Sequence, residues 1–250
     1  MNREMRTSGV SQYADLPRSV FSPIARNYDG PAAALSLFQY RRWHRFLLAR
    51  LDLPQSNESW RMRVLDMATG TGSLALDLAR MPGVDVVGGD ITRPMLMRAW
   101  ERAERKGAGD RVRLVECSAE MPPFADGAFD AMVFAYLLRY VNDVPSTLCR
   151  LAPLVKPGGT IASLDFAVPR GLAYPLWRLY TGVILPAGGQ VFSSAWRRTG
   201  SFLGPNIRSF CRRWPEERLL RAWRDAGMVD VRSKRLSLGG AMVIWGRRSM

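Results

Sequence analysis

The chain has 250 residues, a hydrophobic fraction of 47% and a formal net charge of +14. This composition is typical of a globular domain with a sizeable core, and it excludes a largely disordered basic tail. The three cysteines are far apart without a CxxC pair, and there is a single histidine. A disulfide framework, a zinc cluster and any metal site that needs two histidines are therefore excluded, and a reducing compartment is indicated.

The positive charge is concentrated at the two ends of the chain. Residues 1–63 carry a net charge of +5, residues 64–195 are neutral, and residues 196–250 carry +9. Such flanks indicate a polyanionic partner, either nucleic acid or an anionic membrane surface, or else an arginine-rich surface without such a partner. Residues 1–17 lack the apolar run of a signal peptide, and prolines interrupt the rather apolar stretch 171–192. We expect a cytoplasmic protein, with a membrane surface as a candidate peripheral partner.

Short apolar runs alternate with amphipathic segments from residue 62 onward. Strands are predicted at 62–67, 84–88, 112–116, 131–135 and 160–165. Helices are predicted at 73–80, 93–106 and 144–154, the last ended by the sequence KPGG. After a further helix at 216–226, strands at 229–234 and 241–246 form a closing hairpin. This order predicts an α/β, Rossmann-like doubly wound sheet that is mostly parallel, with an antiparallel closing strand.

A glycine-rich turn follows the first of these strands. Asp66 lies near the strand end, and Gly70 and Gly72 open the next helix, while Asp90 ends the second strand. In an open α/β sheet such turns lie at the carboxyl edge, where ligands bind. A dinucleotide or S-adenosylmethionine would fit, but Asp66 would repel a pyrophosphate and attract a sulfonium or ammonium group. A tight turn without any ligand remains the alternative.

Five segments carry a resemblance to a known family: 21–29 (FSPIARNYD), 64–72 (VLDMATGTG), 89–96 (GDITRPML), 118–130 (SAEMPPFADGAFD) and 154–169 (LVKPGGTIASLDFAVP). In these segments the chain resembles class I S-adenosylmethionine-dependent methyltransferases. More narrowly, it is similar to the ubiquinone/menaquinone biosynthesis C-methyltransferases. The likeness covers roughly residues 20–170 and extends more thinly over 214–246.

The resemblance implies where the methionine end of the cofactor would bind. Asp66, Gly70 and Gly72 would surround the methionine moiety, with Ala68 among the cofactor-binding residues. Tyr28 would lie on a lid over the cofactor. A core aromatic residue on a helix is the alternative for Tyr28.

The resemblance also implies the contacts of the adenosine end. Asp90 would accept the ribose hydroxyls, and Ile91 and Met95 would flank the adenine. Ser118 stands where the family usually has Asp or Asn, and its hydroxyl can still accept a hydrogen bond from the adenine amino group. Ala119, beside Ser118, is also placed among the cofactor-binding residues.

The family motif GFGLRN after the fourth strand reads AYLLRY here, so Arg139 is kept and Tyr140 replaces the asparagine. Methyl transfer to a quinol ring needs an electron-rich acceptor, and Arg139 would stabilise the phenolate as the catalytic cation. An ion pair that holds this loop is the alternative role for Arg139. The single histidine, His44, is interpreted as a surface or packing residue rather than a general base.

The resemblance implies methyl transfer to a lipophilic small molecule, with a demethylmenaquinone-type quinol as the preferred acceptor. Other acceptors, such as a phospholipid amine or a specialised metabolite, remain open. A nucleic-acid-binding or RNA-modifying protein is the alternative from another functional class. Against it, the sequence shows no set of aromatic residues on which nucleic-acid bases could stack. We expect a helical cap or lid at 1–60 and a methyltransferase domain at 61–250. Within that domain, an insert at about 170–212 would cover the substrate.

Overall fold

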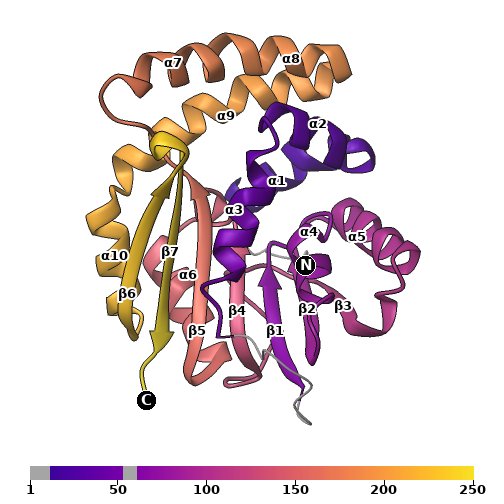
Figure 1. The fold of residues 1–250 in the computed structure, drawn as a ribbon, viewed down its shortest axis with the longest axis vertical. Coiled ribbons are helices and arrows are strands. Elements are labelled where there is room, and N and C mark those ends of the chain that lie inside the picture. The colour runs from indigo at the N-terminus through magenta and orange to yellow at the C-terminus, as the bar shows by residue number, and fades with distance from the viewer. Residues whose placement is uncertain (1–11, 53–60) are drawn as a thin grey trace, which may run out of the picture.

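The computed structural model describes residues 12–52 and 61–250. Its centre is a seven-stranded sheet in the order β3-β2-β1-β4-β5-β7-β6 (Figure 1). The strands are β1 (Met62–Met67), β2 (Val84–Asp90), β3 (Val112–Glu116), β4 (Phe129–Ala135), β5 (Val155–Phe166), β6 (Met228–Leu236) and β7 (Ala241–Arg248). Strand β7 is antiparallel to β5 and β6, and the pairs among β1–β5 are parallel. The predicted Rossmann-like sheet with an antiparallel closing strand is confirmed.

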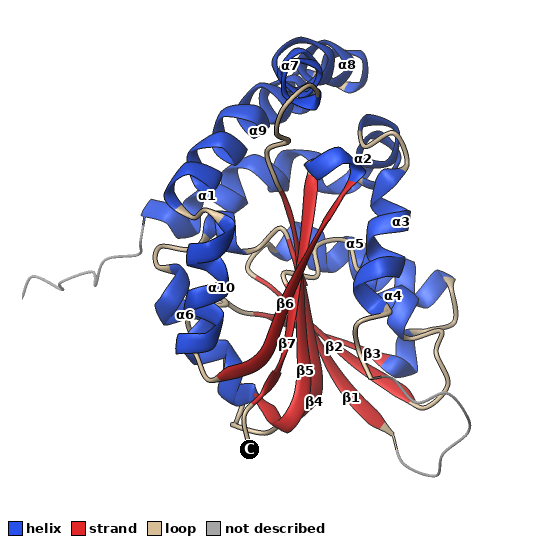
Figure 2. Cartoon of the chain, turned by 60° about the vertical axis from the view of Figure 1, so that its left-hand side comes forward, coloured by secondary structure: helices blue, strands red, loops and turns tan. Residues whose placement is uncertain are grey.

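Helices cover both faces of this sheet, as Figure 2 shows. Helices α6 (Val144–Leu151) and α10 (Glu216–Asp225) pack on one face. Helices α3 (Gln39–Leu48), α4 (Ser73–Leu78) and α5 (Arg93–Arg105) supply side chains to the core on the other face. Because both faces are covered, the central strand β4 is apolar throughout residues 131–135.

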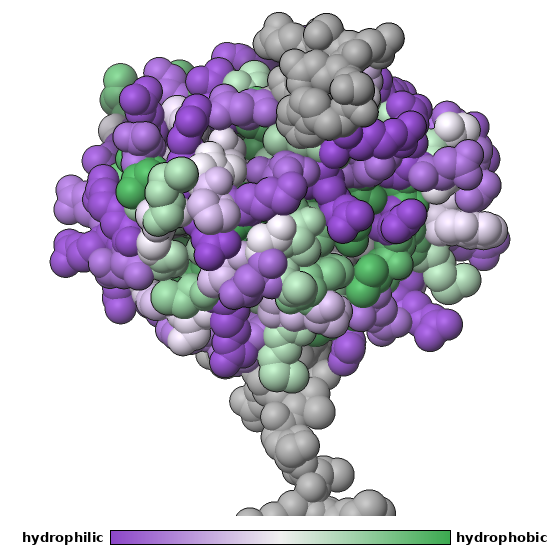
Figure 3. All heavy atoms as spheres, turned by 90° about the horizontal axis from the view of Figure 1, so that it is seen from below, coloured by the Kyte–Doolittle hydropathy of each residue, from purple (hydrophilic) through white to green (hydrophobic). Residues whose placement is uncertain are grey.

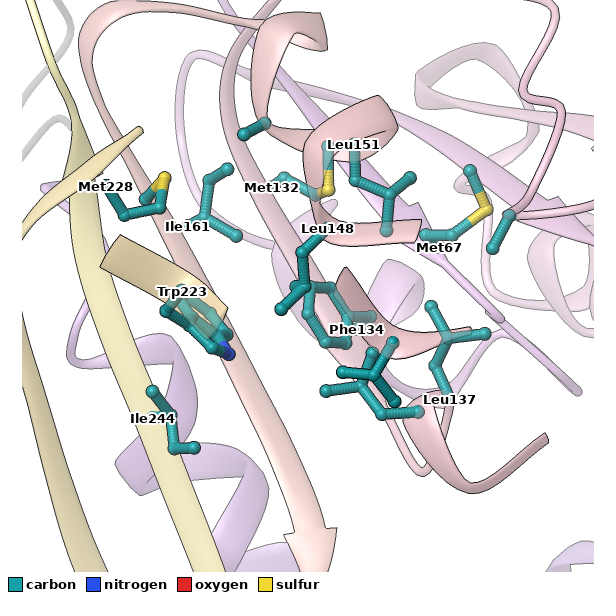
Figure 4. Packing of buried hydrophobic residues seen from close by; sticks show 14 of the residues in the cluster. Met67, Met132, Phe134, Leu137, Leu148, Leu151, Ile161, Trp223, Met228 and Ile244 are labelled. Carbon is teal, nitrogen blue, oxygen red and sulfur yellow. The ribbon is translucent and has the colours of Figure 1, made fainter. Parts of the chain in front are cut away.

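The core between β4 and α10 is centred on an aromatic pair. The Trp223 side chain is fully buried, and its ring stacks on Phe134 with 5.9 Å between the ring centroids. Leu148 and Leu151 of α6 and Ile161 of β5 complete this cluster around the pair (Figure 4). Large buried aromatic rings of this kind contribute much of the hydrophobic stabilisation of a domain.

The remaining helices lie beyond the carboxyl edge of the parallel strands (Figure 1). They are α1 (Gln12–Phe21), α2 (Asp29–Leu35), α7 (Ala173–Leu179), α8 (Leu185–Phe192) and α9 (Ser194–Arg213), with a π-helical turn at Tyr180–Ile184 between α7 and α8. Helices α8 and α9 pack closely because Gly189 faces the Trp196 carbonyl and Gly200 faces the Leu185 carbonyl, where a Cβ atom would clash. None of the described helices combines the length and hydrophobicity needed to cross a bilayer.

The KPGG segment differs from its prediction. The helix α6 ends at Leu151, a 3-10 turn covers Ala152–Leu154, and β5 begins at Val155, so KPGG lies inside the strand. The pairing with β4 shifts register at this point. A Cβ atom on Gly159 would lie 2.4 Å from the Asp130 carbonyl oxygen, so glycine allows the two strands to approach at this irregularity. Of the predicted cap at 1–60, residues 1–11 and 53–60 lie outside the described part of the chain.

Replacing the buried aromatic ring tests this account of the core. We expect Trp223→Ala to lower the free energy of unfolding by about 3–5 kcal/mol, because it removes a fully buried side chain and leaves a cavity beside Phe134. Trp100→Ala on α5 is the matched control, since Trp100 is 60% exposed. Urea unfolding followed by circular dichroism measures both variants. Equal losses in the two variants would contradict this packing argument.

Candidate active site

A cavity of about 570 Å³ opens at the carboxyl edge of the sheet. Its walls include the turns after β1, β2, β3, β4 and β5, the N-terminal helices, and α7 and α9. Most of this wall is apolar, with a few polar groups gathered at the strand ends. This is the place where open α/β sheets bind ligands.

The structure brings most of the predicted site residues to this cavity. Nine line it: Tyr28, Ala68, Gly70, Asp90, Ile91, Met95, Ser118, Ala119 and Arg139. The other two, Asp66 and Gly72, are buried beside the turn without lining the cavity. No group of three or more His, Cys, Asp or Glu side chains among the described residues could hold a metal ion.

The glycine-rich turn after β1 has the backbone that its sequence predicts. Gly70 and Gly72 have φ angles of 55° and 76°, and Ala68 between β1 and the turn also has a positive φ, of 62°. A Cβ atom on Gly72 would lie 3.0 Å from the Cβ of Ala99 in α5. Glycine at 72 therefore satisfies both the left-handed backbone and the close approach of α5.

The Asp90 carboxylate joins the turns that follow β1 and β2. The Gly70 N–H donates a hydrogen bond to Asp90 Oδ2 at 2.8 Å, and the Thr92 N–H donates to Asp90 Oδ1 at 2.8 Å. The carboxylate is 8% exposed and lines the cavity. Burial raises its pKa, and the two backbone N–H groups oppose that shift. Each oxygen keeps lone pairs with which it can accept further hydrogen bonds from a ligand.

Asp66 lies under the same turn and is fully buried. Its Oδ2 accepts a hydrogen bond from the Thr69 hydroxyl at 2.7 Å, and a backbone hydrogen bond from Ala75 also favours the ionised carboxylate. Burial raises the pKa of Asp66 to about 7. A positive charge bound above the turn would favour the ionised form of Asp66, whereas a phosphate would oppose it. The turn therefore suits a cationic ligand.

The wall on the β2 and β3 side has a different character. Met95 is buried, Ile91 is half-buried, and both contribute apolar surface. The Ser118 hydroxyl oxygen already accepts a hydrogen bond from the Glu120 N–H at 3.1 Å. Ala119 is buried beside it. This combination of apolar walls and a polar edge suits a planar aromatic base.

Sequence reasoning missed the contacts that hold the N-terminal helices against the glycine-rich turn. Asp29, at the start of α2, accepts hydrogen bonds from the Thr71 hydroxyl and from Arg102 of α5, both at 2.7 Å. The Arg18 Nε donates to the Ile91 carbonyl at 3.2 Å. Next to Asp29, the Tyr28 ring lies 5.6 Å from the Trp196 ring of α9. The acid after Tyr28 in segment 21–29 was the only sequence signal for this contact.

Arg139, in the turn after β4, is almost completely buried at the cavity wall. Its Nε donates to Asp165 Oδ1 at 2.6 Å, and its Nη1 donates to Asn206 Oδ1 at 2.9 Å. The guanidinium also lies 4.9 Å from the centroid of the Tyr140 ring and 5.2 Å from that of Phe166. Although burial lowers the pKa of Arg139, the Asp165 carboxylate raises it above its usual value, so the group stays charged. Arg139 therefore forms the ion pair that the sequence analysis gave as its alternative role, here with Asp165. The Arg139 side chain also lines the cavity.

His44 of α3 lines another part of the cavity wall and is 6% exposed. Its ring packs edge-on against Tyr40 at 5.3 Å, and Nδ1 is buried without a hydrogen-bond partner. Burial lowers the pKa of His44 to about 4. The side chain is therefore neutral at physiological pH and is a packing residue rather than a surface residue.

Comparison with known proteins identifies the family. The sequence profile of the ubiE/COQ5 methyltransferase family matches residues 10–248. The chain belongs to this family. It is 37% identical to a demethylmenaquinone methyltransferase of Thermus thermophilus over 92% of this chain and 100% of the relative. It is 34% identical to a ubiquinone/menaquinone biosynthesis C-methyltransferase, UbiE, of Desulfotalea psychrophila over 91% and 88%.

Solved structures show the same fold. A geranyl diphosphate C-methyltransferase from Streptomyces coelicolor, solved with S-adenosylhomocysteine, superposes with a TM-score of 0.64 at 15% identity, over 96% of this chain and 100% of that one. The family member described here is thus an S-adenosylmethionine-dependent methyltransferase. The site agrees with that cofactor, because the buried Asp66 carboxylate under the glycine-rich turn favours a cation over a pyrophosphate.

The neutral state of His44 has a consequence for stability. Because its pKa is about 4 in the folded chain and 6.5 when unperturbed, the unfolded chain binds a proton first as the pH falls. His44 therefore contributes a loss of stability between pH 6.5 and pH 4 that reaches about 3 kcal/mol. We expect His44→Phe to remove this loss. Urea unfolding of both proteins across this range measures it, and parallel pH profiles would refute the assignment, because the chain has no other histidine.

Proposed function

We propose that this methyltransferase C-methylates a demethylmenaquinone-type quinol. The observation that carries the proposal is a buried cation, Arg139, in the wall of a largely apolar cavity that also contains the glycine-rich turn. The names of the relatives from Thermus thermophilus and Desulfotalea psychrophila support the same acceptor class. An apolar cavity suits a lipophilic ring and its tail, because burying apolar surface is favourable.

The turns after β1 and β2 would hold the cofactor. We assign Gly70, Gly72 and Ala68 to the methionine end, with the Asp66 charge beneath it. Asp90 would accept the ribose hydroxyls with the lone pairs that its two backbone bonds leave free. When bound, S-adenosylmethionine supplies the methyl group as an electrophile.

The adenine would lie against the neighbouring wall. We assign Ile91 and Met95 to its two faces, and Ser118 and Ala119 to its edge. Tyr28 would close the cavity above the cofactor, since its ring packs against Trp196 of α9. Together these residues would orient the cofactor and exclude water.

Arg139 would act on the acceptor. The neighbouring hydroxyl would lose its proton to solvent, which makes the quinol ring carbon a good nucleophile, and a fixed cation would stabilise the resulting phenolate. After methyl transfer, the proton of the methylated ring carbon would be lost to solvent as the ring regains its aromaticity. Asp165 and Asn206 hold the guanidinium in place, so it need not reorganise during the reaction. The apolar and aromatic surroundings strengthen its electrostatic effect by excluding water.

We further propose that α1–α3 serve as a lid and α7–α9 as the substrate cover. Both groups contribute residues to the cavity wall, including Tyr40 and Trp177. The arginine-rich ends of the chain would hold the enzyme peripherally on an anionic membrane, since residues 196–250 carry a net charge of +9. Such contact would place the enzyme where a lipophilic quinol resides.

One assay tests the acceptor. Purified enzyme is incubated with radiolabelled S-adenosylmethionine and, in separate reactions, demethylmenaquinol in detergent, membrane lipid extract and total RNA. We expect label in demethylmenaquinol and in the quinone fraction of the extract. Label only in RNA, in a phospholipid or in another metabolite would overturn the proposed acceptor.

The assignment of Asp90 predicts a loss of cofactor affinity. We expect Asp90→Ala to weaken S-adenosylmethionine binding by roughly 10- to 100-fold, because both turns lose their shared acceptor and the ribose loses its partner. Asp85→Ala is the control, since Asp85 lies on the same strand in an exposed ion pair with Arg61. Isothermal titration calorimetry measures both affinities. Unchanged binding by a folded Asp90→Ala enzyme would refute the assignment.

Arg139 requires a test that separates catalysis from stability. Arg139→Gln alone leaves the Asp165 charge buried and unpaired, which costs about 3–5 kcal/mol. The double variant Arg139→Gln/Asp165→Asn removes both charges, and we expect it to recover much of that stability. Its kcat/KM for the quinol should remain roughly 10²- to 10³-fold below that of the wild type. Recovery of activity together with stability would show that Arg139 only holds the loop.

A further inference from the structure

Helices α7 and α8 expose an unusual number of large apolar side chains. We define the apolar rim as Leu172, Leu176, Leu179, Val183, Ile184 and Val191, each of which is more than half exposed. Four of them, at positions 172, 176, 179 and 183, follow the 4-3-4 spacing of one helical face. A surface helix normally presents a polar face to water. A continuous apolar face therefore indicates an interaction surface.

A second segment extends this rim. Leu37 and Phe38, in the turn between α2 and α3, are 66% and 62% exposed. This turn is held next to the rim, because the Tyr180 hydroxyl donates a hydrogen bond to the Leu35 carbonyl and α2 packs on α8. Both segments lie at the same end of the molecule, beyond the carboxyl edge of the sheet (Figures 1 and 2). At the opposite end, polar side chains lie between the apolar ones (Figure 3).

The opposite side of the rim helices faces the cavity. Ala173, Trp177 and Thr181 line it, and the next turn of the helix contributes Leu185. Leu176 of the rim lines the cavity as well, so the exposed apolar face borders the cavity wall. A partner that covers the rim would also lie against the wall of the acceptor cavity.

The charge of the helices that carry the rim, and of the segments next to them in the chain, favours one occupant. Residues 166–215 contain seven arginines and no aspartate or glutamate, and residues 30–51 contain four arginines and again no acid. A symmetric contact with a second copy of the chain would bring these like charges together. An anionic bilayer instead offers negative headgroups to the arginines and acyl chains to the apolar side chains.

We propose that the apolar rim inserts into the interfacial layer of an anionic phospholipid bilayer, with α7 and α8 lying in the plane of the membrane. The cavity then receives its lipophilic acceptor from the bilayer through the edge of these helices. The inserted segments lie in the interface rather than across it, consistent with the finding that none of the described helices is both long and apolar enough to cross a membrane. The delivery route rests on the proposed quinol acceptor, whereas the insertion does not.

Vesicle binding tests the insertion directly. We compare the wild type with Leu172→Glu/Val183→Glu, which places two charges on the rim at positions outside the cavity wall. The matched control is Met97→Glu/Trp100→Glu, at two side chains of α5 that are each 60% exposed. The probe is cosedimentation with vesicles of equal parts phosphatidylglycerol and phosphatidylcholine. We expect the rim variant to bind at least about tenfold more weakly, and the control to bind like the wild type.

Two substrates separate this proposal from the proposed function. We expect the rim variant to methylate a short-chain, water-soluble quinol at the wild-type rate and a long-chain quinol in vesicles much more slowly. Failure of the wild type on both quinols would overturn the acceptor and leave the vesicle result standing. Equal vesicle binding by the rim variant and the wild type would overturn the insertion. So would conversion of a wild-type dimer to a monomer by the rim substitutions, because a second copy would then be the occupant.

Discussion

Parallel strands end at one edge of their sheet, and this constraint organises the whole molecule. The turns after β1, β2, β4 and β5 all reach that edge, so their backbone and side-chain polar groups converge there. Each of these groups needs a partner away from bulk water. Asp90 supplies two acceptors for the turns after β1 and β2, and Arg139 with Asp165 joins the turn after β4 to the end of β5. The cavity and its polar groups are consequences of the same geometry.

The edge also has to be covered, and two distant parts of the chain do this together. The N-terminal helices are held by Asp29, which reaches both Thr71 in the glycine-rich turn and Arg102 in α5. The helices between β5 and α10 cover the other side, and Tyr28 meets Trp196 where the two parts join. Covering the edge excludes water, which strengthens the electrostatic effect of the few charges left inside.

Charge is distributed differently between the central sheet and the helices that cover its carboxyl edge. Residues 64–195 are neutral overall, and the buried Arg139 is paired there with Asp165. The excess of arginine lies in the flanks and in the helices that cover the edge, where α7 and α8 also expose apolar side chains. In the proposed membrane contact, the basic groups would meet the lipid headgroups and the apolar side chains would meet the acyl chains.

The sequence by itself determined the strands, their βα alternation and the glycine-rich turn, because these depend on local periodicity and on backbone angles that glycine adopts. It also placed Asp90 and Arg139 near the carboxyl edge of the sheet, because Asp90 ends β2 and Arg139 lies in the turn after β4. The sequence predicted KPGG at the end of a helix, whereas it lies inside β5. Only the close approach of β4 shows that Gly159 belongs to the register shift between these two strands. Only the tertiary structure decided that Asn206 holds Arg139, that Asp29 bonds to Thr71 and Arg102, and that His44 is buried. These contacts join residues far apart in the chain, and no local pattern encodes which of them meet.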